Sequence, residues 1–166
     1  YYGGIHRPIK LFFTGEYEDE IFSIISGTSI KCSFINKING FNEILWLDSL
    51  DRWLYTLIYA NNKAVFISDL KINYNINNIN YNDYFNFDRY SNFVYAETYY
   101  IKKYKTFLDL LIYYIRIFYR LLYFKLRNLD IYYSLTLNLL VNSFNIKKIE
   151  NILNLYRYKY FDNNNS

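Results

Sequence analysis

The chain has 166 residues, enough for one ordinary domain or two very small ones, and it can bury a core. Tyr, Asn and Ile supply 22 residues each, Met is absent, and Pro, Cys and His occur once each. One Cys and one His exclude an internal disulfide and argue against a zinc or haem site of the usual kind, so we expect no metal and no cofactor. The formal net charge is only +4, but it is unevenly distributed along the chain.

Short strand and helix patterns alternate through the first seventy residues. Alternating apolar side chains predict strands at 9–13, 30–34 and 63–69. Helical spacing of apolar side chains and acids at a helix start predict helices at 16–26 and 42–59. Asn39-Gly40 predicts a turn between them. We therefore expect an α/β domain in residues 1–70.

Residues 71–100 separate this half from the rest of the chain. From Lys71 to about Asn92 the sequence consists mainly of Asn, Tyr, Asp and isolated Ile, without a sustained period. Such a stretch is typical of a long loop or insertion rather than of a core element.

Residues 102–127 have the spacing of a long basic helix. Apolar residues recur every three or four positions and predict a buried stripe: Tyr104, Leu108, Leu111, Ile115, Phe118, Leu122 and Leu126. Most charged residues take the other face, where we expect a solvent-side ridge of Lys105, Asp109, Arg116, Arg120 and Arg127.

After this helix the apolar period changes to two. Ile131, Tyr133, Leu135, Leu137, Leu139 and Val141 alternate with mostly polar residues, which predicts a half-buried strand over 131–142. Asn145 stands where a helix N-cap belongs. The next helix has an apolar face of Ile146, Ile149, Leu153 and Tyr156.

The basic residues concentrate in the last third of the chain. Residues 101–166 hold eleven Lys or Arg against four acids, a surplus of seven in a chain whose total is +4. A basic region with regular secondary structure and many aromatic residues favours contact with phosphate. The predicted RNA-binding residues are Lys102, Lys105, Arg116, Arg120, Arg127, Lys147 and Lys148. The competing interpretation is a solvent-facing helix side without a ligand.

Signals for catalysis are weak. The acidic run at 15–20 could offer oxygen ligands to a hard cation, and Asp48 with Asp51 could act as paired carboxylates. Both are better explained as solvated surface charge. His6 has no Ser or Cys near it in sequence, and the five glycines form no phosphate-binding loop. We predict that the protein is not an enzyme.

The composition also suggests where the gene resides. Tyr, Asn, Ile, Lys and Phe have A/T-rich codons, so this bias is typical of an A/T-rich organelle genome. Such genomes mostly retain ribosomal proteins and respiratory-chain subunits, which predicts a mitochondrial matrix location. No window of about 20 residues is free of charge, so we expect no transmembrane segment.

Residues 102 to about 151 resemble the small-subunit ribosomal protein 3 family at the start of its carboxy-terminal domain. The resemblance is carried by Leu108-Asp109 at the helix opening, by Arg116, Arg120 and Arg127 along the helix, and by the apolar alternation. It continues through Val141-Asn142-Ser143 at a turn and Ile146, Lys148 and Glu150 in the next helix. The family's turn glycine is Ser143 here.

The resemblance implies a fold, a function and partners. The fold is α+β, with a degenerate KH-like N-terminal half and the helix-strand-helix start of a second α/β domain in 101–166. That domain would be either truncated here or completed by a second polypeptide. The function is a structural constituent of the mitochondrial small ribosomal subunit, binding rRNA in the head near the mRNA entry path, where Arg116 and Arg120 would lie, beside other ribosomal proteins. The alternative is a soluble or peripheral accessory subunit of a respiratory-chain complex.

Overall fold

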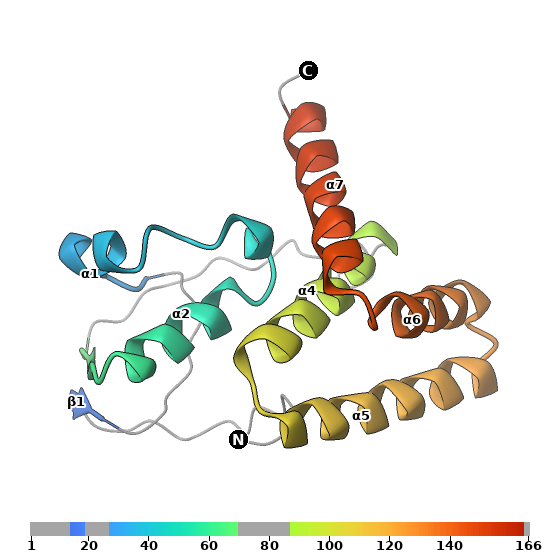
Figure 1. The fold of residues 1–166 in the computed structure, drawn as a ribbon, viewed down its shortest axis with the longest axis horizontal. Coiled ribbons are helices and arrows are strands. Elements are labelled where there is room, and N and C mark those ends of the chain that lie inside the picture. The colour runs from blue at the N-terminus through green and yellow to red at the C-terminus, as the bar shows by residue number, and fades with distance from the viewer. Residues whose placement is uncertain (1–13, 19–26, 70–86, 165–166) are drawn as a thin grey trace. The chain divides into compact units, whose positions relative to one another are not determined.

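The structure, a computed structural model, describes residues 14–18, 27–69 and 87–164, which form two compact units (Figure 1). Residues 14–69 are called the N-terminal unit and residues 87–164 the helical unit. The described residues are mostly helical with one small sheet, which confirms the α+β class at that coarse level. The strand predicted at 9–13 and most of the helix predicted at 16–26 lie outside the described residues.

The N-terminal unit combines short helices with a two-stranded antiparallel sheet. Its elements are β1 Gly15–Tyr17, α1 Cys32–Lys37, the 3-10 helix η1 Glu43–Leu45, α2 Leu50–Ala60 and β2 Val65–Ile67. In the sheet, Glu16 pairs with Phe66, flanked by Gly15 with Ile67 and Tyr17 with Val65. The strand predicted at 63–69 is therefore confirmed over β2. The predicted helix at 16–26 is wrong for its first residues, because Glu16 and Tyr17 lie in β1.

The predicted strand at 30–34 is wrong, since α1 begins at Cys32. The backbone N–H of Ile35 donates to Lys31 O at 3.2 Å, a helical bond. A pattern of five alternating residues is too short to distinguish a strand from a short helix, especially when no residue of that helix is buried. The predicted turn is confirmed, because Asn39 and Gly40 have φ of 61° and 84°, where glycine costs least.

The predicted helix at 42–59 is divided into η1 and α2. Ser49 has a left-handed backbone with φ of 62°, so a continuous helix ends before α2 begins. Buried residues of this unit lie on both pieces: Leu45, Trp53, Leu54, Tyr55 and Ile58. The apolar face predicted for this segment is thus only partly right, with Trp53 and Leu54 buried while Trp46, Leu50 and Leu57 are half-buried.

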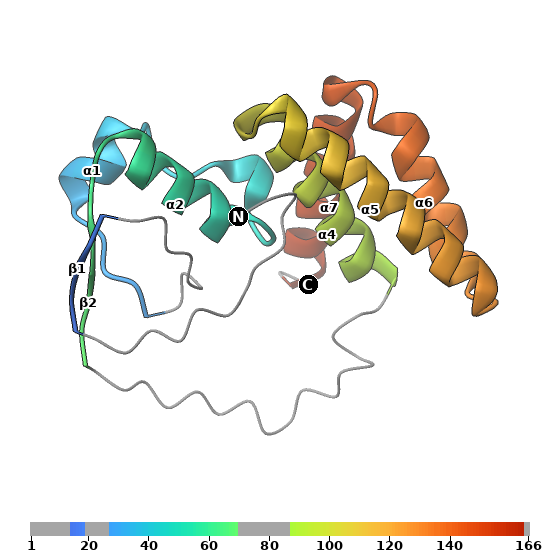
Figure 2. The ribbon, with the colours of Figure 1, turned by 90° about the horizontal axis from the view of Figure 1, so that it is seen from below.

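The helical unit consists of four helices joined by short turns. They are α4 Phe87–Tyr104, α5 Phe107–Leu126, α6 Asp130–Asn142 and α7 Ile146–Asn164. Helices α4 and α5 run in opposite directions, and so do α5 and α6, as contacts near and far from each turn show. For α4 and α5 these are Thr98 with Tyr113 and Tyr90 with Phe124. Figure 1 and Figure 2 both place α5 and α6 side by side. No helix within the described ranges is long and apolar enough to cross a membrane.

Helix α4 lies at the centre of this unit and contacts α5, α6 and α7. Nearly all of its residues from Tyr90 to Ile101 are buried. This corrects the prediction of a loop over 71–100, at least for residues 87–100. A helix that is covered on several sides needs no single apolar stripe, so the pattern that identifies a surface helix is missing from it.

The predicted strand at 131–142 is wrong, because these residues form α6. Ile131, Leu135 and Leu139 are four residues apart, a spacing shared by a period of two and by a helix. The buried residues Leu135, Thr136 and Leu139 follow the helical period, whereas Leu137 is exposed. The C-terminal region is therefore helix-helix-helix rather than the helix-strand-helix predicted for 101–166.

The ends of α5 and α7 follow local sequence signals. Thr106 and Asp109 form a capping box at the start of α5: Thr106 Oγ1 accepts the Asp109 backbone N–H at 3.3 Å, and the Asp109 carboxylate accepts that of Thr106 at 3.2 Å. The N-cap predicted at Asn145 is confirmed, because its Oδ1 accepts the Lys148 N–H at 3.2 Å. Ile149 and Leu153 are buried as predicted. Lys102 and Tyr104 belong to α4, so the predicted helix at 102–127 is two helices.

Candidate nucleic-acid interface

The centre of the helical unit holds a buried carboxylate between two arginines. Glu97 on α4 is fully buried. Arg120 Nη1 lies 3.1 Å from Glu97 Oε2, and Arg116 Nη2 lies 3.8 Å from Glu97 Oε1. Arg116 and Arg120 are one turn apart on α5, so one helix face delivers both cations to the same acid. Burial lowers the pKa of Arg120, but the Glu97 carboxylate together with Tyr113 and Tyr90 outweighs burial, so the net pKa is raised.

A hydroxyl network continues from this cluster into the packing between α4 and α5. The Thr98 hydroxyl donates to Val94 O at 2.7 Å and lies 2.7 Å from the Tyr113 hydroxyl. Burial first, and the Glu97 carboxylate second, raise the pKa of Tyr113 well above its usual range. Tyr113 therefore stays neutral and acts as a hydrogen-bonding core residue.

The predicted solvent-side ridge is consequently corrected for two of its members. The side chains of Arg116 and Arg120 are only 26% and 24% exposed and are turned toward Glu97. The stripe predicted to be buried is the exposed one, with Leu108, Phe118 and Leu126 more than half exposed. The error has one cause: α4, which supplies both Glu97 and the packing surface for α5, was expected to be a loop.

The remaining predicted residues include four lysines at one end of the unit. Lys103 Nζ lies 3.7 Å from Glu150 Oε1, which brings the turn between α4 and α5 beside the start of α7. Within two residues or one helical turn of this pair stand Lys102, Lys105, Lys147 and Lys148. We call these five residues, Lys102, Lys103, Lys105, Lys147 and Lys148, the turn lysines. Lys103 was not predicted as a site residue, although it follows Lys102 directly.

The turn lysines differ in how much of each side chain is available. Lys147 and Lys148 are exposed in the first turn of α7, and neither ammonium lies in an ion pair with a described residue. Lys105 lies over the Tyr100 ring at 5.8 Å, and Lys103 donates to the Tyr99 hydroxyl at 2.7 Å. Lys102 is half-buried. Lys147 and Lys148 are therefore the pair most open to a ligand.

Arg127, the last predicted residue, lies apart from this group. It caps the C-terminal end of α5, exposed, with its guanidinium 5.8 Å from the centre of the Tyr123 ring. A helix of twenty residues is about 30 Å long, so Arg127 and the turn lysines lie at opposite ends of α5. The seven predicted residues thus fall into a buried pair, a cluster at one end and a single cation at the other.

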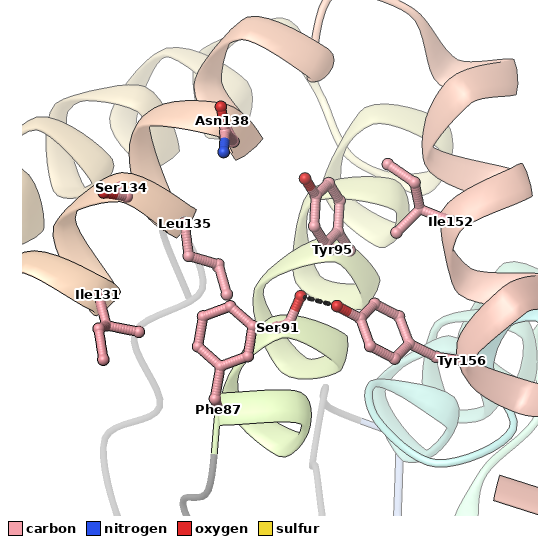
Figure 3. A pocket seen from close by; sticks show the side chains of 9 residues that line it. All are labelled: Phe87, Ser91, Tyr95, Ile131, Ser134, Leu135, Asn138, Ile152 and Tyr156. Atoms are coloured by element: carbon pink, nitrogen blue, oxygen red, sulfur yellow. Dashed lines mark hydrogen bonds between the residues drawn. The ribbon is translucent and has the colours of Figure 1, made fainter. Parts of the chain in front are cut away.

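A pocket of about 500 Å³ opens between α4, α6 and α7 (Figure 3). Its lining is aromatic, aliphatic and neutral polar, and Ser91 Oγ lies 2.6 Å from Tyr156 Oη across it. No charged side chain lines it, so the pocket adds nothing to the phosphate-binding potential of the turn lysines.

Acidic and metal-ligating residues form no cluster in the part of the chain that the structure describes: no group of three or more His, Cys, Asp or Glu gathers there. The acidic run at 15–20 contributes Glu16 to β1 and extends outside the described residues. Asp48 is buried and Asp51 accepts the Arg52 backbone N–H at 2.8 Å.

No family model, curated protein or solved structure matches the chain.

Proposed function

We propose that this protein is a non-catalytic, RNA-binding structural constituent of the mitochondrial small ribosomal subunit. The observation that carries the proposal is the cluster of the five turn lysines, of which Lys103 pairs with Glu150. Lysines grouped at one end of a helical unit can each neutralise a backbone phosphate and release the counterions condensed on RNA.

The position of Lys147 and Lys148 supports a role outside helix stability. Both stand in the first turn of α7, where the positive end of the helix macrodipole disfavours cations by about 0.3–1 kcal/mol each. An anionic partner would reverse that cost, because it would attract both ammonium groups and the dipole together.

The proposal differs from the family resemblance in its details. Arg116 and Arg120, on which contact near the mRNA entry path depended, pair with Glu97 and are not included. Residues 131–142 form a helix, so the spacing resemblance of that segment does not support the proposal. We propose rRNA of the small subunit as the partner because of the charge distribution along the chain and because the amino-acid composition is typical of an A/T-rich organelle genome.

The proposal includes a degenerate KH-like fold for residues 1–70, and it assigns no nucleic-acid binding to these residues. A KH domain clamps backbone with a GxxG loop. The corresponding turn between α1 and η1 reads Asn39-Gly40-Phe41-Asn42. RNA contact is therefore proposed for the helical unit alone.

The RNA contact is tested by the salt dependence of binding to a structured RNA hairpin, followed by fluorescence anisotropy. When log of the association constant is plotted against log of the salt concentration, Lys147→Ala with Lys148→Ala should make the negative slope shallower by about two units. The matched control is Lys37→Ala with Lys63→Ala, which removes two exposed lysines from the N-terminal unit and should leave the slope unchanged. Equal slopes for the first pair and the wild type would contradict the proposal.

The assembly is tested separately in the organelle. Epitope-tagged protein should sediment with the small ribosomal subunit on a sucrose gradient. Migration with respiratory complexes on a native gel, together with absence from the small-subunit fractions, would favour an accessory respiratory subunit instead.

A further inference from the structure

Helix α5 has a second apolar face that its own unit does not cover. Tyr113, Ile117 and Leu121 are buried against the unit, whereas the opposite face is exposed. We call the exposed line the α5 seam: Leu108, Leu111, Ile115, Phe118 and Leu122. In Figure 1 this helix forms the lower edge of the unit, and Figure 2 views it from that side.

The α5 seam has the spacing of a helix that packs on another helix. Its residues are separated by three, four, three and four positions, the a and d positions of a heptad. The next position in the series, 125, is a lysine. Tyr119 and Leu126 widen the seam on one side.

The exposed area of this face is large. The exposed fractions of the five seam residues, Tyr119 and Leu126 add up to about four fully exposed residues, which at about 150–250 Å² each is roughly 600–1,000 Å². The largest apolar patch of an ordinary monomer is about 300–600 Å². A standard protein interface takes about 800 Å² from each partner, so two such faces would suffice for a stable dimer.

We propose that the α5 seam is a homodimer interface, in which α5 packs antiparallel on α5 of a second copy. A two-fold axis pairs the same surface with itself, so one seam supplies both sides. A parallel pair would oppose Lys125 to Lys125. The antiparallel pair instead places Lys125 beside Leu108 in the first turn of the partner's α5 and aligns the two helix dipoles favourably. The dimer is independent of the proposed RNA contact.

The oligomeric state of the full chain tests the proposal. Sedimentation equilibrium of the wild type should show a mass that rises with concentration from 20.4 kDa toward twice that value. Ile115→Glu with Phe118→Glu should keep the helical circular dichroism and reduce association at least tenfold. Leu155→Glu, at an exposed apolar position on α7, is the control and should associate as the wild type does. The proposal would be overturned if the wild type stays monomeric, or if the Ile115→Glu with Phe118→Glu variant associates as strongly as the wild type.

Cysteine cross-linking tests the orientation. The exposed Cys32 is first replaced by Ser. Pairing of Lys125 with Leu108 of the second copy places the two-fold axis between residues 116 and 117. At 1.5 Å per residue, the two copies of Ile115→Cys then lie about 5 Å apart along the helices, and the two copies of Leu108→Cys lie about 25 Å apart. A short bismaleimide should therefore link Ile115→Cys to itself. It should link Leu108→Cys only when that chain is mixed with Lys125→Cys. Self-linking of Leu108→Cys would overturn the antiparallel arrangement.

Discussion

Removal of Arg120 should destabilise the helical unit strongly, in contrast to what a surface cation would do. Arg120→Leu leaves the Glu97 carboxylate, whose side chain is 1% exposed, with Arg116 as its remaining ion-pair partner at 3.8 Å. Removing one member of a buried ion pair costs about 3–5 kcal/mol, because the other charge stays buried without compensation. Since Arg116 compensates in part, we expect the lower end, about 3 kcal/mol.

A double variant separates loss of the ion pair from loss of packing. Glu97→Gln with Arg120→Leu removes both charges, so it should be more stable than Arg120→Leu alone, by about 1–2 kcal/mol. Arg127→Leu, at the exposed end of the same helix, is the control and should cost at most about 1 kcal/mol.

Urea unfolding followed by far-UV circular dichroism measures these differences, because most of the helix signal comes from α4 to α7. Trp46 and Trp53, the two tryptophans, belong to the N-terminal unit, so their fluorescence reports on that unit in the same experiment. A cost of Arg120→Leu below about 0.5 kcal/mol, the size typical of an exposed ion pair, would refute the buried cluster.

Two further predictions follow from the same unit. Thr106→Ala should lower stability by about 1 kcal/mol, because it removes the capping box of α5, and Thr106→Ser should restore most of that loss in thermal unfolding. Burial raises the pKa of Tyr113 above the unfolded value near 10, so the neutral form is favoured in the folded state. The contribution of this pKa shift to the free energy of unfolding is therefore complete below about pH 10, and it declines above that pH by about 1.4 kcal/mol per pH unit. Tyr113→Phe should make this decline shallower in unfolding experiments between pH 9 and 12. An equally steep decline in the variant would show that other groups cause it.

Several elements were predictable because their signals are local. The turn at Asn39-Gly40, the N-cap at Asn145 and strand β2 depend on neighbours within a few residues. The apolar face of α7 follows from helical spacing alone. The charge asymmetry of the chain is likewise a property of the sequence.

Other elements could not be predicted from local patterns. Residues 131–142 satisfy the strand period and the helix period together at Ile131, Leu135 and Leu139, so packing against α5 and α4 decided between them. Helix α4 is covered by α5, α6 and α7, and its mixture of Tyr, Thr and Glu has no apolar stripe to reveal it. With α4 missing from the prediction, Glu97 could not be recognised as the partner of Arg116 and Arg120.

The sequence by itself determined that α5 is amphipathic, that basic residues stand at both of its ends, and where α7 begins. Tertiary structure decided which face of α5 is buried, and with it which cations reach solvent. The physical reason is that capping and turn formation depend on hydrogen bonds between residues close in sequence. Burial of a face depends instead on a surface supplied by a distant segment, here the one that contributes Glu97.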